Sequence, residues 1–425
     1  MRERAASEPM DDGTPARGPV AAPNPAGPVV ETVTDPDRLR ALAPEWEALA
    51  SEAGLDHPFL THEWVEAWWE AFGAGRDLHV LVVRDAGRTI AIAPLMRGRI
   101  RICGLPVASL ESIGNEHTPR GGFLVAPERR DAFAVLWDRL FRRGRPFKVV
   151  VLRQLPGASE TLVTMQGLAA RAGWLVGRWR SAESPWLRVA GTDFPAYYET
   201  LSSRFRAHLR NKERRARKIG DLEVETVTGE ADLEAALADG LRIEASGWKG
   251  KAGSAIQSEA ATLRFYTLLA RRAARRDWLR LNFLRVGGRR IAFNYTLRYA
   301  RRRFVLKSGY DADYASLSPS SLLVRNILER VFERGDEEYD FLGDRDPWKV
   351  SWTGTARPHD WLYLMPPSLP LRLLHAAKFQ LVPRLRLSPV FRRALGAHRD
   401  GGHAAGRGGE DGADRDGARA ERRDV

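Results

Sequence analysis

Three serines stand where a loop enters a helix, in the stretch KSGYDADYASLSPSSLLVRNILERV that begins at residue 307. The first turn of a helix presents unpaired N–H groups and partial positive charge, which together attract phosphate anions. Ser318 suits the capping position, Pro319 suits the first helical position, and Ser320 and Ser321 add hydroxyl donors. These residues predict either a site for a nucleotide pyrophosphate or an ordinary capped helix.

A second polar group, in YDFLGDRDPWKVSWT from residue 339, follows the end of an apolar strand. Folds of the α/β type place ligands just beyond the carboxyl ends of their strands. A carboxylate at Asp344 could take the proton of an incoming amine, and Lys349 could stabilise a developing oxyanion or hold a phosphate. We therefore expect Asp344 to act as a base, supported by Lys349 and Tyr310. The alternative is a solvated turn with ion pairs.

A third feature is the basic stretch RFRAHLRNKERRARK, residues 204–218, in which eight residues are Lys or Arg and only Glu213 is acidic. Its arginines recur at spacings of three and four, so several of them share one helix face and repel one another. An anionic partner would relieve that repulsion, whereas the alternative is a solvated face in an arginine-rich chain. Arg210 is a candidate for contact with a substrate, as are Trp248 and Lys249 in a loop after a predicted helix.

The composition is that of a globular protein without disulfides or a membrane span. Of 425 residues, 44% are hydrophobic and 28% charged, with 67 Lys+Arg against 54 Asp+Glu. The single cysteine, Cys103, excludes a disulfide framework and a cysteine-based zinc site, and the nine histidines show no paired spacing. No apolar run is long enough to span a bilayer, and residues 1–28 lack a signal-peptide core. We expect a cytoplasmic protein without a metal.

The elements that would position these residues alternate helices and strands in two similar halves. Each half has a pair of helices before a hairpin that turns at glycine, VVRDAGRTIAIAPL in the first and FLRVGGRRIAFNYTL in the second. We expect an α/β (α+β) fold in two tandem units with mixed, mainly antiparallel sheets, and one helix over residues 194–220. The expected divisions are a disordered lead (1–28), two domains (29–190 and 191–366), a basic amphipathic segment (367–399) and a disordered tail (400–425).

Two further stretches each allow two interpretations. The polar stretch from Asn115 to His117 could bring His117 to a substrate or could be a surface loop. Residues 361–399 contain no Asp or Glu, and their arginines are interleaved with leucines. Because Pro383 and Pro389 interrupt this segment, it cannot be one long helix. It either packs back onto the protein as a cap or anchors it peripherally to an anionic membrane.

The sequence resembles the GNAT-type acetyltransferases of the CelD family, which are associated with cellulose and exopolysaccharide biosynthesis. The resemblance spans roughly residues 30–365 and is carried by HPFLTHEWVEAWWEAFGAG, GWKG, IAFNYTL, KSGYDADYASLSPSSLL and YDFLGDRDPWKVSWT, in that order. This family is similar to the FemABX peptidoglycan aminoacyltransferases, which carry two GNAT folds in tandem. The chain departs from the family pattern at Ser320, where glycine is usual, and at Trp348, where tyrosine is common. It also lacks the R/Q-x-x-G-x-G/A loop of typical GNAT enzymes.

The resemblance implies an acyltransferase that moves an acyl group from acetyl-CoA, or another acyl-CoA, to an amine or hydroxyl of a sugar, cell-envelope or exopolysaccharide precursor. The acceptor would attack the thioester directly, since the lone Cys103 lacks a nearby base motif. One alternative is FemX-like aminoacyl transfer from charged tRNA, which the basic helix would contact. Another is a non-catalytic module that binds nucleic acid or a membrane-bound synthase. The expected location is the cytoplasm, and the alternative is peripheral contact with the inner membrane face.

Overall fold

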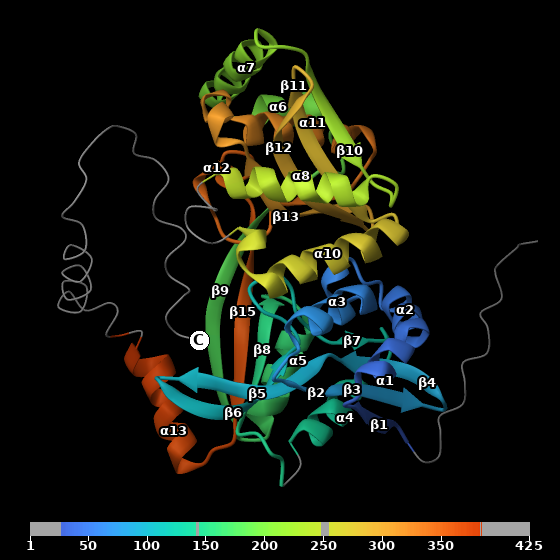
Figure 1. The fold of residues 1–425 in the computed structure, drawn as a ribbon. Coiled ribbons are helices and arrows are strands. Elements are labelled where there is room, and N and C mark those ends of the chain that lie inside the picture. Colours follow the sequence, from blue (N-terminus) through green and yellow to red (C-terminus); the bar gives the residue numbers. More distant parts are fainter. Residues whose placement is uncertain (1–26, 142–143, 248–254, 383, 385–425) are drawn as a thin grey trace, which may run out of the picture.

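The computed structural model describes residues 27–141, 144–247, 255–382 and 384 (Figure 1). Most of the expected lead, the whole expected tail, Trp248 and Lys249 lie outside these residues. The first half has helices α1 (Pro36–Ala41), α2 (Ala43–Glu52), α3 (His62–Phe72), α4 (Asp131–Leu140) and α5 (Glu160–Arg171), with the 3-10 turn η1 (Pro58–Leu60). Its strands are β1 (Val29–Val33), β2 (Asp77–Leu78), β3 (Val80–Asp85), β4 (Arg88–Ala93), β5 (Leu95–Ile102), β6 (Leu105–Ser112), β7 (Leu124–Val125), β8 (Val149–Pro156) and β9 (Leu175–Arg188).

Helices and strands also alternate in the second half. Its helices are α6 (Phe194–Thr200), α7 (Ser203–Arg217), α8 (Leu233–Ser246), α10 (Ala260–Arg275), α11 (Pro319–Glu333), α12 (Pro347–Val350) and α13 (Leu369–Ala376), with short turns η2 (Ile256–Ser258), η3 (Ala312–Leu317) and the π-helical η4 (Ala377–Leu381). Its strands are β10 (Leu222–Val227), β11 (Leu279–Val286), β12 (Arg289–Tyr299), β13 (Arg302–Tyr310), β14 (Glu338–Asp340) and β15 (Ala356–Met365).

The strands form one 11-stranded sheet that runs through both halves and a 4-stranded sheet in the first half. The long sheet has the order β10-β11-β12-β13-β14-β9-β15-β8-β6-β5-β2, and the short one the order β1-β3-β4-β7. Two neighbouring pairs, β6 with β8 and β13 with β14, run parallel, while the other pairings between described strands are antiparallel. The predicted mixed, mainly antiparallel architecture is confirmed.

The two parallel pairs mark a corresponding unit in each half. In the first, β6 leads through α4 to β8, and Ser109–Glu111 pair with Val149–Val151. In the second, β13 leads through α11 to β14, and Arg302–Phe304 pair with Glu338–Asp340. The preceding hairpins, β3–β4 and β11–β12, both turn through two residues with positive φ, which matches the twist of the flanking strands. The predicted tandem arrangement is therefore visible in the strand pairing itself.

Strands β9 and β15 join the two halves. The end of β9, Trp186–Arg188, pairs with β14, whereas the rest of β9 pairs with β15. Strand β15 comes from the second half but lies between β8 and β9. The boundary expected between residues 190 and 191 falls in the connection from β9 to α6, yet the sheet continues across it.

The expectation of a single helix over residues 194–220 is wrong, because α6 and α7 are separate. Leu201 is extended (φ −68°, ψ 150°), and the side chain of Ser202 caps α7 by accepting a hydrogen bond from the N–H of Phe205 at 3.3 Å. A hydroxyl that can satisfy a free N–H favours a new helix start at this position. The break allows Phe194 and Tyr197 to pack on α11, while α7 runs along the end of the molecule (Figure 1).

The halves also share an apolar core between α3 and α10. Trp64 and Phe265 meet edge to face at 5.2 Å between ring centroids, and Phe59 meets Phe304 at 5.3 Å. All four rings are buried, so separating the halves would expose large aromatic surface to water. Within the described residues, no helix has the length and apolar character needed to cross a membrane.

Candidate functional site

The parallel strands β13 and β14 part shortly after they pair. Their register ends at Phe304 and Asp340, and β13 continues to Tyr310 without a β14 partner. A bulge interrupts its pairing with β12, since Tyr295 faces Lys307 but Thr296 faces Val305. The residues of β13 beyond Val305 are half-buried rather than buried. Beyond Phe304, the main chain of β13 is therefore not paired with β14.

The amino end of α11 lies at the same edge of the sheet, because η3 connects it directly to the end of β13. Ser318 occupies the position before the helix, but in the left-handed conformation (φ 50°, ψ 53°). Its carbonyl accepts hydrogen bonds from the N–H groups of Ser321 and Leu322 at 3.0 and 3.2 Å. Its hydroxyl makes no capping bond and lies 3.1 Å from Nε2 of His208 on α7. Ser318 thus occupies the predicted capping position and Pro319 the first turn, but the Ser318 side chain does not make the capping hydrogen bond.

Lys349 is tied into the turn that follows β14. Its side chain is 10% exposed, in a chain segment where Leu342 and Gly343 both have positive φ. The ammonium donates to the carbonyls of Leu342 and Asp344 at 2.9 and 3.1 Å and pairs with Asp346 at 2.7 Å. An ammonium has three N–H donors, so this turn engages all of them. Lys349 therefore stabilises this turn, which agrees with the alternative interpretation of the segment as a turn with ion pairs.

Asp344 follows the carboxyl end of β14, and Tyr310 is the last residue of β13. Asp344 is exposed, and its Oδ1 accepts hydrogen bonds from the N–H groups of Glu183 and Arg345 at 3.2 and 3.1 Å. Tyr310 is half-buried against the apolar cluster that Trp348 also borders, and its carbonyl accepts a bond from the Ser246 hydroxyl at 3.1 Å. Because β13 and β14 are parallel, their carboxyl ends bring both residues to the edge where α11 begins.

A buried charge cluster under this edge was missed by the sequence analysis. Asp340, the last residue of β14, is fully buried and accepts hydrogen bonds from the Leu342 N–H at 2.7 Å and from the Ser184 hydroxyl at 3.2 Å. It pairs with Arg120 from the first half and with Arg357 of β15, the latter at 2.9 Å. Two carboxylates at alternate positions of the strand EEYDFLG were the available signal, because alternate residues share one face.

The same two arginines also hold Glu338, the other carboxylate on that face of β14. Arg357 binds it at 2.9 Å and Arg120 lies 3.5 Å away. Two histidines flank the cluster, and both are buried. Burial, reinforced by Arg120 and Arg357, lowers the pKa of His359 to about 4 and holds the pKa of His57 well below its usual value. The two rings are therefore neutral at physiological pH.

His117 belongs to a second polar group at the junction of the halves. Thr262 of α10 donates its hydroxyl hydrogen to Glu259 at 2.7 Å, so the Nε2–H of His117 donates to Thr262 Oγ1 at 3.2 Å. The ring lies among aromatic side chains of α3 and α10, and burial, with a smaller effect from Lys307, lowers its pKa to about 3. The interpretation of residues 115–117 as a surface loop is therefore wrong for His117.

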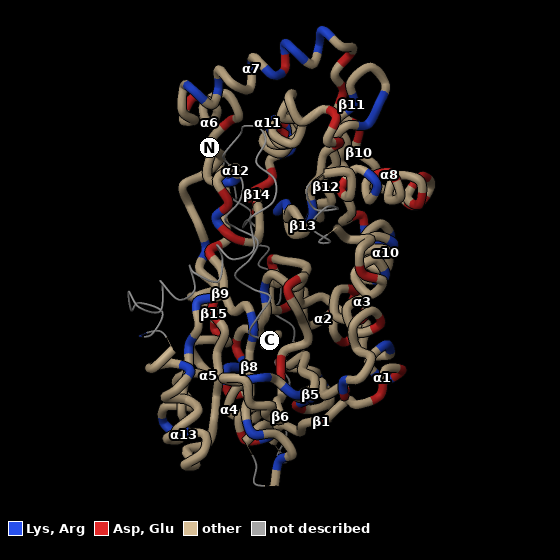
Figure 2. Tube along the Cα trace, turned by 60° about the vertical axis from the view of Figure 1, so that its left-hand side comes forward, with Lys and Arg blue, Asp and Glu red and all other residues tan. Residues whose placement is uncertain are grey.

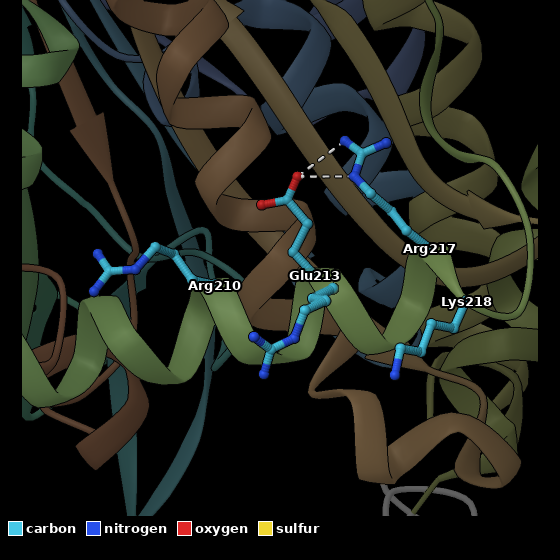
Figure 3. A pocket seen from close by; sticks show the side chains of 5 residues that line it. Arg210, Glu213, Arg217 and Lys218 are labelled. Carbon is cyan, nitrogen blue, oxygen red and sulfur yellow. Dashed lines mark hydrogen bonds and ion pairs between the residues drawn. The ribbon is translucent and has the colours of Figure 1, made fainter.

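Arg210 is on the outer face of α7, apart from the point where β13 and β14 separate. It lines a shallow cavity of about 430 Å³ together with Glu213, Arg214, Arg217 and Lys218 (Figure 3). Glu213 accepts a hydrogen bond from Arg217 at 2.9 Å, and no carboxylate in the described residues pairs with Arg210, Arg214 or Lys218. Figure 2 shows basic residues along most of this helix. Trp248 and Lys249, the other candidates for substrate contact, lie outside the described residues.

Comparison with known proteins addresses the fold and the enzyme class. Residues 203–350 match the family model described as "Acetyltransferase (GNAT) domain". Among solved structures, the chain is similar to FemX, with 11% identity and a TM-score of 0.53 over 81% of this chain and 99% of that one. A search of curated proteins found no significant match.

Two further similar structures have TM-scores below 0.5. L-PGS from Bacillus licheniformis has 11% identity and a TM-score of 0.46 over 80% of this chain and 96% of that one. A tandem GNAT protein from the clavulanic acid biosynthesis pathway has 15% identity and a TM-score of 0.45 over 80% and 100%. The likeness to FemX supports the tandem fold, and the family match over residues 203–350 confirms the predicted enzyme class, an acyltransferase.

Proposed function

We propose that the protein transfers an acyl group from acyl-CoA to an amine or hydroxyl of a sugar, as in a cell-envelope or exopolysaccharide precursor. The observation that carries the proposal is the parting of β13 from β14 at the edge where α11 begins. This edge lies inside the segment that matches the acetyltransferase model. The resemblance to the CelD family suggests the class of acceptor.

The donor would occupy the edge of β13 and the amino end of α11. Strand β13 continues to Tyr310 after its pairing with β14 ends at Phe304, and its main chain there would bond the amide groups of an extended pantetheine chain, much as a sheet binds an added strand. The pyrophosphate would then lie at the first turn of α11, near the hydroxyls of Ser320 and Ser321. Ser318 contributes through its backbone and its contact with His208, which fix the entry to the helix.

The transfer itself requires a base and a polarised thioester. The acceptor amine or hydroxyl attacks the thioester carbonyl, and its proton passes to a base. The C–S bond then breaks, and the departing CoA thiolate takes up that proton to leave as the thiol. Asp344 is our candidate base, because it is an exposed carboxylate at the end of β14. Lys349 supports it indirectly by holding the turn, and Tyr310 provides a phenol on the opposite strand.

The donor site can be tested by ligand-induced stabilisation. At about 100 times the dissociation constant, acetyl-CoA or desulfo-CoA should stabilise the protein by about 2.7 kcal/mol, seen as a higher melting temperature. Ser320→Asp places a negative charge beside the pyrophosphate and should abolish the shift. Ser159→Asp is the matched control, since Ser159 caps α5 and Asp caps a helix equally well.

The outcomes separate the candidate functions. A full shift in Ser320→Asp would remove the donor site from α11. No response to either CoA compound, together with stabilisation by charged tRNA, would favour aminoacyl transfer instead. That second candidate is supported by the FemX-like fold and by the basic face of α7, which could contact a phosphate backbone. A protein that responds to none of these ligands would be a non-catalytic binding module. The proposed location is the cytoplasm.

A further inference from the structure

The polar group around His117 lies beside the edge of β13 that the proposed donor would occupy. Lys307 is on β13 beyond Phe304, where the pairing with β14 ends, and its Nζ lies 5.3 Å from the ring centroid of Tyr266 on α10. The Tyr266 ring also meets His117 edge to face, at 5.6 Å between centroids. Tyr295, which faces Lys307 from β12, donates its hydroxyl hydrogen to the Tyr266 carbonyl at 3.2 Å. Tyr266 therefore connects this edge of the second half to a loop of the first half.

Two buried tryptophans of α3 fix the loop that carries His117. Trp68 donates its indole N–H to Asn115 Oδ1 at 3.0 Å, and Trp64 donates to the Thr118 hydroxyl at 3.3 Å. Asn115 Oδ1 also accepts a hydrogen bond from the main-chain N–H of His117 at 3.1 Å. Because α3 packs against α10, these bonds hold the His117 ring beside α10 without the help of a ligand (Figure 1).

The same loop is bonded along the end of β8 in the first half. The Ser112 hydroxyl accepts a hydrogen bond from the N–H of Arg153 at 3.2 Å, and the N–H of Gly121 donates to the Gln154 carbonyl at 2.9 Å. A Cβ atom at Gly121 would lie 2.2 Å from the Arg153 carbonyl oxygen, so the contact requires glycine. At the corresponding place in the second half, β13 and β14 separate. The loop therefore closes the first half and turns His117 toward the second.

His117 and Tyr266 each have a polar atom without a hydrogen-bond partner among the described residues. The Nε2–H of His117 is used by Thr262, which leaves Nδ1 as an acceptor. Tyr266 is 2% exposed, and its hydroxyl has no partner either. Burial, reinforced by the carboxylates of Glu244 and Glu116, holds the pKa of Tyr266 well above its usual value, so the phenol keeps its proton. The side chain of Glu116 is 67% exposed. These groups therefore offer one hydroxyl, one neutral imidazole nitrogen and one accessible carboxylate.

We propose that Tyr266, His117 and Glu116 form the acceptor site and that this site binds a sugar amine. The Glu116 carboxylate and the His117 Nδ1 only accept hydrogen bonds, which suits an amino group with several N–H donors better than a hydroxyl with one. The Lys307 ammonium beside the same ring favours the neutral form of the amine as it approaches β13, because like charges repel. Only the neutral amine can attack a thioester. The proposal rests on the proposed transfer reaction and names its acceptor side.

Saturation-transfer NMR of the full chain with glucosamine and with glucose tests the proposal. The two sugars differ only in the amine or hydroxyl at one carbon, and no donor is needed. We expect glucosamine to bind and glucose to bind at least about threefold more weakly. Tyr266→Phe removes a single hydroxyl and should weaken the binding of glucosamine by about threefold to tenfold. Glu116→Gln should weaken it by a similar factor and remove the preference for glucosamine over glucose.

Tyr299→Phe and Glu128→Gln are the matched controls, since Tyr299 is a half-buried phenol of β12 and Glu128 an exposed carboxylate of the first half. Neither should change the binding of glucosamine. The proposal is overturned if glucosamine shows no saturation transfer, if glucose binds as well as glucosamine, or if Tyr266→Phe and Glu116→Gln bind glucosamine as well as the controls. Stabilisation by acetyl-CoA together with any of these results would keep the proposed reaction and remove only this acceptor site.

Discussion

Replacing Arg120 by methionine tests what holds the two halves together beneath the candidate site. Arg120 is 3% exposed and reaches from the first half to Asp340 and Glu338 of β14. Its guanidinium also lies over the ring of Phe304, 5.3 Å from the centroid. Methionine keeps most of the side-chain volume but removes the charge. The two carboxylates would then share a single charged partner, the half-buried Arg357.

The expected cost follows from the burial of the pair. Two unit charges about 4 Å apart interact by about 4 kcal/mol at an effective dielectric constant of about 20. Removing one partner of a buried pair typically costs about 3–5 kcal/mol, because the other charge stays buried. Arg357 still contacts both carboxylates in the variant, so we expect the lower end, about 3 kcal/mol.

Urea unfolding at pH 7, followed by tryptophan fluorescence, measures this change. The control is Arg242→Met, whose ion pair with Asp239 is exposed on the surface and should contribute no more than about 1 kcal/mol. A double-mutant cycle of Arg120→Met with Asp340→Asn should show an interaction free energy of at least about 1.5 kcal/mol. If Arg120→Met costs no more than the control, or if the two substitutions are additive, the cluster does not couple the halves.

Three further predictions concern the same region. Burial beside Arg120 and Arg357 lowers the pKa of His359 to about 4, so between pH 6.5 and 4 the unfolded chain binds a proton that the folded chain excludes. The free energy of unfolding should therefore fall by about 3 kcal/mol for this residue as the pH decreases from about 6.5 to 4. His359→Gln should flatten that part of the plot of urea midpoint against pH. Lys349→Met should lower stability by about 1.5–3 kcal/mol in the same assay, since the buried carbonyl of Leu342 and the part-buried carbonyl of Asp344 lose a charged donor. Asp344→Asn should leave stability within about 0.5 kcal/mol and lower kcat by about 10²-fold or more if Asp344 is the base.

The sequence analysis succeeded where the pattern is local. The helix that became α11 and the strands on either side of it are set by apolar periodicity and by Pro319, and the hairpin turns are marked by glycine. Helix α6 was merged with α7 because neither glycine nor proline lies between them. Only the capping bond of Ser202, a contact over three residues, separates them.

The features that were missed depend on residues distant in the chain. Strand β15 was not predicted because His359 and Asp360 interrupt its apolar pattern, and Asp360 is buried only because Arg178 and Arg180 of β9 pair with it. The left-handed conformation of Ser318 likewise depends on packing between η3, α11 and α7. Periodicity within one segment carries no information about such partners.

The position of β15 between β8 and β9 changes how the proposed acyl-donor site should be understood. Asp340 holds the N–H of Leu342 in the turn that begins the site, and Asp340 is itself neutralised by Arg120 of the first half and Arg357 of β15. Strand β14 has β9 as one of its two neighbours, so the first half supplies part of the sheet under the site. The second half carries the match to an acetyltransferase domain, but its turn geometry and its charge balance both require the first. The tandem unit, rather than residues 191–366 alone, is therefore the unit that positions the candidate base and the donor edge.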